Sequence, residues 1–182
     1  LLNRGVYGSS LLLLLGEMSS KYQHLAVRVS LTSTSAADPW EFWREIFHAI
    51  YIAACQTSII EESHIGFESK PGGGDMGRKY SLHQQFEKAY GDYVTHTGPQ
   101  ILATHIVEED LKLLCDCVLE AGYRGILLML DEAHLLTKPL EWSLEIKQQL
   151  RRAVQESGSC GIIFAGEPQL GQVIQLSVHY CH

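Results

Sequence analysis

GILLMLDEAH, residues 125–134, is the stretch that decides the fold. Its apolar residues 126–130 run directly into the acidic pair Asp131-Glu132. A run this short and this apolar is typical of a parallel strand that is buried on both faces of a sheet. Open parallel sheets bind ligands at the carboxyl ends of their strands, so the two carboxylates indicate a functional site. The alternative is a strand followed by a solvated Asp-Glu turn.

The composition indicates one soluble globular domain over residues 1–182. Hydrophobic residues make up 46% of the chain and charged residues 19%, which is the balance of a folded protein. The net charge of −7 does not favour a surface built to bind nucleic acid, although a local basic patch is compatible with it. The apolar block 11–15 is too short to span a membrane, which takes about 20 residues. The odd number of cysteines, five, favours a reducing cytoplasm over a disulfide framework.

The N-terminal segment has the order of elements expected around a phosphate-binding loop. Residues 3–10, NRGVYGSS, are followed by a helix expected over Ser9 to about Lys21. A strand rich in β-branched residues is expected next, over His24–Leu31. A glycine-containing turn, a helix and a strand in this order are the context of such a loop, although no strand precedes it beyond Leu1-Leu2.

The loop itself is degenerate. The motif is G-x-x-x-x-G-K-[ST], and alignment on Gly8 and Ser10 places Asn3 at the first glycine and Ser9 at the lysine. Alternatively, the window from Gly5 to Ser10 looks like a G-x-Y-G-S-G-K-S loop from which Gly-Lys has been deleted. Backbone N–H groups at the helix N-terminus could still hold an anion, but the ammonium that reaches the phosphates is missing. Taken alone, the segment is better read as a plain helix entry.

The rest of the chain predicts a doubly wound α/β fold. Asp38 is suited to cap a helix that begins at Pro39. Strands that alternate with helices favour a parallel sheet with helices on both faces. The helical region, about residues 38–121, is expected to be an insertion in a single domain. Further helices are expected over residues 81–94, 105–121, 140–156 and 170–176, and a further apolar strand over residues 161–166.

LLMLDEAH, residues 127–134, looks like a Walker B motif. With the N-terminal loop and the second apolar strand, it resembles P-loop ATPases of the AAA+ and STAND groups. Those groups include transposition-regulator, secretion-associated and defence-system ATPases of bacteria and archaea. The resemblance covers roughly residues 3–31 and 105–176. It implies a three-layer P-loop NTPase-like parallel sheet that is incomplete at the N- and C-terminal ends. This chain would supply strands 2, 3 and 4 of the order 5-1-4-3-2, and we expect it to be a fragment.

The resemblance also implies roles for individual residues and two cofactors, ATP and Mg²⁺. Asp131 would hold Mg²⁺ through water, with the hydroxyl of Ser10 as a second ligand. Glu132 would polarise the attacking water as the catalytic base. The residues implied at the nucleotide are Gly5, Gly8, Ser9, Ser10 and, at the end of the second apolar strand, Glu167.

Two positions depart from the family pattern. Ser9 stands where the loop lysine is required, and Glu167 is an acid where related ATPases often have Thr, Ser or Asn. Hydrolysis depends on positive charge at the phosphates. The missing lysine therefore leaves open whether the chain is an enzyme.

The first functional hypothesis is a cytoplasmic, Mg²⁺-dependent regulatory ATPase whose ATP binding or hydrolysis changes its assembly with itself or with a protein partner. The second is a catalytically inactive P-loop-like scaffold for protein–protein interaction. A third is a metal hydrolase that uses Asp131, Glu132 and His134, for which no further ligand is evident. The letters DEAH also occur in RNA helicases, but no second helicase motif appears.

Overall fold

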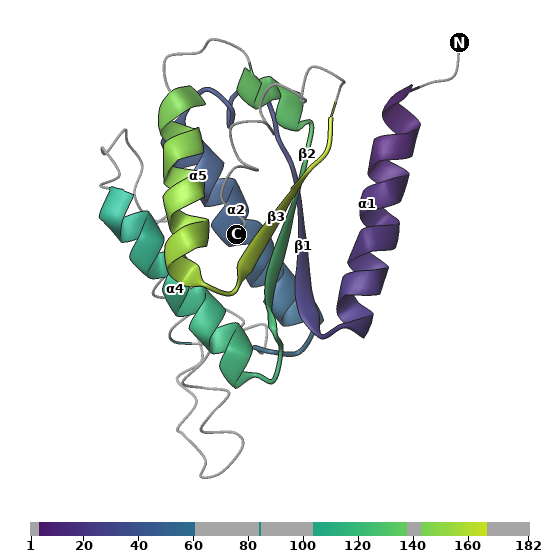
Figure 1. Cartoon of the computed structure of the whole chain (residues 1–182), viewed down its shortest axis with the longest axis vertical. Helices are drawn as coiled ribbons and strands as arrows, with labels where there is room; N and C mark the ends of the chain where they lie inside the picture. The colour runs from purple at the N-terminus through teal and green to yellow at the C-terminus, as the bar shows by residue number, and fades with distance from the viewer. Residues whose placement is uncertain (1–3, 61–83, 85–103, 138–142, 167–182) are drawn as a thin grey trace, which may run out of the picture.

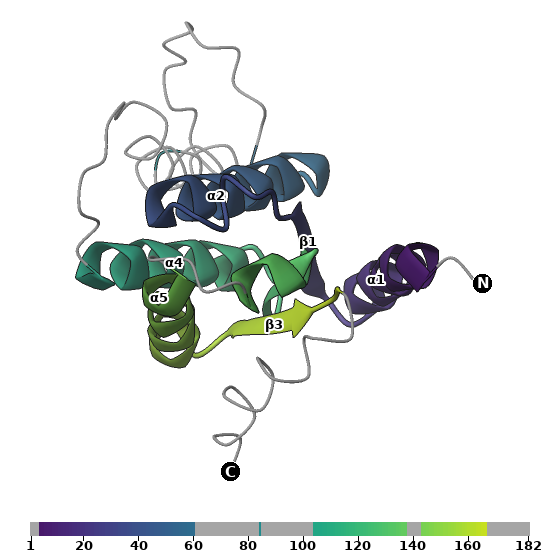
Figure 2. The same ribbon diagram turned by 90° about the horizontal axis from the view of Figure 1, so that it is seen from above.

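The computed structural model describes residues 4–60, 84, 104–137 and 143–166. Its centre is a three-stranded parallel sheet in the order β1-β2-β3. Helix α1 lies on one face of this sheet, and α2, α4 and α5 lie on the other (Figure 1; Figure 2). The α/β fold with a parallel sheet and helices on both faces is thus confirmed. The elements are α1 (Arg4–Lys21), β1 (His24–Ser30), α2 (Pro39–Gln56), α4 (Thr104–Glu120), β2 (Gly125–Asp131), the 3₁₀ helix η1 (Ala133–Thr137), α5 (Ser143–Ser157) and β3 (Cys160–Phe164).

The central strand, β2, is buried along nearly its whole length. Leu128 and Leu130 join the core that the strands share with α2, α4 and α5. Met129 points to the other face, where a Cβ atom added at Gly16 of α1 would lie 3.3 Å from its Cε. Burial of one such side chain stabilises a fold by about 2 kcal/mol. The continuous apolar run therefore reflects a strand covered on both sides, as predicted.

Helix α2 begins as its sequence indicates. The Asp38 carboxylate accepts a hydrogen bond from the Trp40 backbone N–H at 2.8 Å, and Pro39 occupies the first turn. Trp43 is fully buried, and its indole Nε1 donates to Oε1 of Gln149 on α5 at 2.7 Å. This bond ties α2 to α5 over the sheet. The buried apolar face of α2 consists of Trp40, Phe42, Trp43, Ile46, Phe47, Ile50, Ala53 and Ala54.

Gly125 fixes the entry to the central strand. Its φ is +151°, and an added Cβ would lie 2.1 Å from the backbone oxygen of Ser159. That same oxygen accepts a hydrogen bond from the N–H of Ile126 at 2.9 Å. A side chain at position 125 would therefore collide with the start of β3, so only glycine allows β2 and β3 to approach this closely.

Several boundaries differ from the predictions. Helix α1 starts at Arg4 instead of Ser9, and β3 covers Cys160–Phe164 instead of 161–166. The first described turn of α5 starts at Ser143, because residues 138–142 lie outside the described part. Apart from Gln84, which is helical, the helices predicted over 81–94 and 170–176 also lie outside it. No helix in the described ranges is both long and apolar enough to cross a membrane.

Candidate functional site

The acidic pair lies where β2 leaves the sheet. Asp131 is the last residue of β2 and pairs in register with Ser30, the last residue of β1. Backbone hydrogen bonds join the three strand exits: the Leu31 N–H donates to the Asp131 carbonyl at 3.1 Å, and the Ala133 N–H donates to the Ala165 carbonyl at 2.8 Å. These hydrogen bonds fix the residues that follow the three strands relative to one another at one edge of the sheet. Ligand sites of parallel sheets lie at this edge.

Asp131 is a buried carboxylate with a cationic partner. Its side chain is 8% exposed. Oδ2 accepts a hydrogen bond from Nη2 of Arg28 at 2.7 Å, and Oδ1 accepts from the backbone N–H of Glu132 at 3.0 Å. A buried charge is costly unless it is paired. The Arg28 guanidinium and the backbone N–H together make this position acceptable to a carboxylate.

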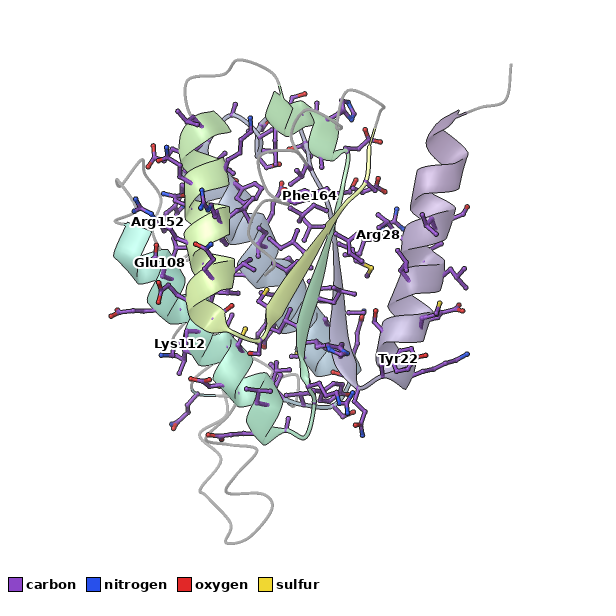
Figure 3. The ribbon with its side chains drawn as sticks, in the orientation of Figure 1. Tyr22, Arg28, Glu108, Lys112, Arg152 and Phe164 are labelled. Carbon is purple, nitrogen blue, oxygen red and sulfur yellow. The ribbon has the colours of Figure 1, made fainter. Side chains whose placement is uncertain are left out.

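Strand geometry explains why Arg28 reaches Asp131. Leu25, Val27 and Val29 of β1 are buried in the core, so the alternate residue Arg28 points to the face that carries α1 (Figure 3). Arg28 pairs in register with Met129, two residues before Asp131. A long side chain spans such a diagonal between neighbouring strands.

Sequence reasoning missed this residue. The signal available in the sequence was an arginine between the two apolar residues Val27 and Val29 of the strand.

Glu132 has a strained backbone. Its φ is +56°, a left-handed conformation that residues other than Gly, Asn and Asp rarely adopt. Its side chain is 51% exposed, and Oε2 lies 3.3 Å from Nδ1 of His134, an ion pair when the imidazole is protonated. Strain of this kind costs about 1–3 kcal/mol and clusters at functional sites. The turn therefore presents the Glu132 carboxylate to solvent beside the buried Asp131.

The oxygen donors at this edge fit Mg²⁺. Magnesium prefers carboxylate oxygens and is usually held by one or two of them together with waters and substrate phosphates. Asp131 and Glu132 supply such oxygens at adjacent positions. In the described residues, no group of three or more His, Cys, Asp or Glu side chains forms a metal cage. Asp131 would hold Mg²⁺ through water together with a phosphate-bearing ligand, which leaves the exposed Glu132 carboxylate beside the metal position.

The predicted phosphate-loop residues lie within α1 and not in a loop before it. Gly5, Gly8, Ser9 and Ser10 all fall between Arg4 and Lys21, and Ser10 is exposed. Beyond the first turn of a helix the backbone N–H groups bond to its own carbonyls, so only the first turn leaves N–H groups for an anion. The N-terminal end of α1 lies at the level of the carboxyl ends of the strands, but it stands apart from the sheet (Figure 1; Figure 2). Glu167 lies outside the described residues.

The structure thus brings Asp131 and Glu132 together with Arg28 and His134. It does not bring them together with Gly5, Gly8, Ser9 or Ser10.

A second group of reactive side chains lies at the opposite end of the sheet. Cys115 of α4 and Cys160 of β3 are buried. The neighbouring Cys160 thiol lowers the pKa of Cys115 although burial opposes this, whereas contact with Cys115 and burial raise the pKa of Cys160. Burial raises the pKa of Cys117 to about 12. These thiols pack as small apolar side chains.

A comparison of the chain with protein-family models, with curated proteins and with solved structures finds no match.

Proposed function

We propose that this chain is an ATP-binding domain of the P-loop ATPase type, related to the AAA+ and STAND groups, that acts as a regulatory ATPase in the cytoplasm. The observation that carries the proposal is the acidic pair Asp131-Glu132 at the carboxyl end of the central strand. The unbroken parallel order β1-β2-β3 supports it, because strands 2, 3 and 4 of such an ATPase are contiguous. The strained, solvent-facing Glu132 beside the buried Asp131 supports it further.

Each residue of the edge has a separate role in this proposal. Asp131, held by the Glu132 N–H, orients its carboxylate toward the metal position through water. Glu132 accepts a proton from the attacking water, and His134 steadies its carboxylate at 3.3 Å. Mg²⁺, when bound, supplies positive charge to the phosphate oxygens. No phosphate contact is proposed for Gly5, Gly8, Ser9 or Ser10, because they lie along α1 and away from this edge. Glu167 keeps the position at which related ATPases often carry a polar sensor residue.

The test is phosphate release from ATP by the wild-type chain and by Glu132→Gln, with Glu156→Gln on the exposed side of α5 as the control. Loss of a general base lowers turnover by about 10²–10⁴-fold. We expect Glu132→Gln to lose turnover by at least about 100-fold while ATP binding persists, and Glu156→Gln to match the wild type. Equal turnover in all three proteins would contradict the role of Glu132. A wild-type chain that does not bind ATP would contradict the function itself.

A second candidate, a catalytically inactive scaffold, is favoured by two observations on α1. Ser9 replaces the loop lysine, and the outer face of α1 exposes Leu11, Leu14 and Met18 at helical spacing, followed by the exposed Tyr22 directly after the helix. Exposed apolar patches often mark protein–protein contacts, which would suit self-association or a protein partner.

Replacement of Ser9 by Lys separates the two functions. Nucleotide binding gained by Ser9→Lys would favour an ATPase that has lost its lysine. No gain, combined with no binding by the wild type, would favour the scaffold.

A further inference from the structure

The side chain of Arg28 lies where it affects any cation at Asp131. Its Nη2 is 2.7 Å from Oδ2 of Asp131, and this is the shortest ion-pair contact of the site. The second carboxylate oxygen, Oδ1, already accepts the Glu132 N–H. A metal ion or its hydration shell that approaches the carboxylate therefore meets a positive charge at hydrogen-bonding distance.

The two partners differ in burial, and this difference sets which of them can move. The Asp131 side chain is 8% exposed and sits at the end of the central strand, whereas the Arg28 side chain is 35% exposed. A guanidinium that is one-third exposed can turn toward water at modest cost, because its long side chain keeps the charge solvated. The Asp131 carboxylate cannot turn toward water in this way, because it lies on a short side chain that is buried at the end of β2. If a metal ion binds the Asp131 carboxylate, the Arg28 guanidinium is therefore the group that moves away.

We propose that Arg28 is a positioning residue that holds Asp131 in the metal-free protein and competes with Mg²⁺ for its carboxylate. The inference rests on the proposed function, in that Asp131 must be the metal-binding carboxylate. Arg28 then sets the affinity of the site: it keeps the buried carboxylate neutralised before the metal arrives and weakens metal binding by the strength of the ion pair. Competition of this kind is a coupling between two ligands of one group, and such couplings change affinities by about 5–150-fold.

The experiment is a titration with Mg²⁺, first without nucleotide and then at saturating ATP, monitored by calorimetry and by the thermal unfolding midpoint. The proteins are the wild type, Arg28→Gln, Arg28→Lys and Arg44→Gln. Arg44 pairs with Glu41 on the exposed side of α2, so its replacement changes the net charge by the same amount at a remote place.

We expect Arg28→Gln to bind Mg²⁺ about tenfold more tightly than the wild type, and Arg44→Gln to match the wild type. Lysine keeps the charge but loses the planar fork of the guanidinium. Arg28→Lys should therefore bind Mg²⁺ about threefold more tightly than the wild type. This variant tests the competition if Arg28→Gln does not fold.

Three results would overturn the inference, and only the last would also overturn the metal role of Asp131. Equal, measurable Mg²⁺ affinity in the wild type and the Arg28 variants would refute competition while leaving the metal role of Asp131 intact. The same conclusion would follow if Arg44→Gln tightened binding as much as Arg28→Gln. If none of the four proteins responds to Mg²⁺ with or without ATP, Asp131 is not a metal-binding carboxylate, and the Mg²⁺-dependent form of the proposed function fails together with the inference.

Discussion

Removal of Arg28 should destabilise the metal-free protein more than removal of the charge of Asp131. In Arg28→Gln a carboxylate that is 8% exposed loses its guanidinium partner and keeps the hydrogen bond from the Glu132 N–H. Breaking a fully buried ion pair costs about 3–5 kcal/mol. Because the Arg28 side chain is 35% exposed, solvent already screens the pair, so we expect a loss of about 2 kcal/mol.

In Asp131→Asn the amide oxygen can still accept the Glu132 N–H, and the freed guanidinium of Arg28 is solvated. The expected loss is therefore only about 1 kcal/mol, the value of a partly exposed pair. The double variant should cost no more than Arg28→Gln alone, because its neutral side chains leave no unpaired buried charge.

The assay is urea unfolding at neutral pH in the presence of a chelator, with tryptophan fluorescence as the signal. Arg44→Gln, which breaks the exposed pair with Glu41, should cost less than about 0.5 kcal/mol and serves as the control. The reasoning would be refuted if Arg28→Gln were no more destabilising than Asp131→Asn. It would also be refuted if the two single losses simply added in the double variant.

Three further predictions concern the packing of the fold around the sheet. Gly125→Ala should cost more than about 3 kcal/mol by thermal unfolding, because its Cβ would meet a backbone oxygen at 2.1 Å, whereas Gly122→Ala, with a φ of +92° and open space around it, should cost about 1–2 kcal/mol. Gln149→Leu leaves the buried Trp43 indole N–H without its acceptor and should cost about 1–3 kcal/mol. The same substitution should cost less in a Trp43→Phe background, where no indole N–H is left unpaired, and a double-mutant cycle by thermal unfolding measures this difference. Alkylation of Cys117 at pH 8 should be negligible in the native protein and fast after unfolding, because burial raises its pKa to about 12 and removes the reactive thiolate. Peptide mapping by mass spectrometry measures the alkylation, and rapid alkylation of Cys117 in the native protein would contradict its burial.

The local sequence predicts those parts of the fold that depend on local patterns. The apolar run before Asp131 specifies a strand buried on both faces, and Asp38-Pro39 specifies the start of α2. Both signals lie within a few residues of the feature that they determine. The alternating and helical periodicities likewise predict β1 and α4 to within a residue or two.

The remaining features depend on partners far away in the sequence. The bond between Arg28 and Asp131 joins residues 103 positions apart, and only the register of β1 against β2 brings them together. The left-handed backbone of Glu132 has no local signal, because glutamate does not favour that conformation. Helix α1 extends through Gly5 and Gly8, although each glycine costs a helix about 1 kcal/mol; the pattern predicted a loop there.

The most direct test of the proposed function is equilibrium binding of ATP with Mg²⁺ to the wild-type chain, measured by the rise in its thermal unfolding midpoint. Binding at about 100 times the dissociation constant stabilises a protein by about 2.7 kcal/mol. For a chain of this length that corresponds to a rise in the unfolding midpoint of roughly 5–10 °C. A nucleotide site at the Asp131-Glu132 edge predicts a saturable rise of this size. An unfolding midpoint that does not move at saturating ATP, with no heat of binding, would contradict it.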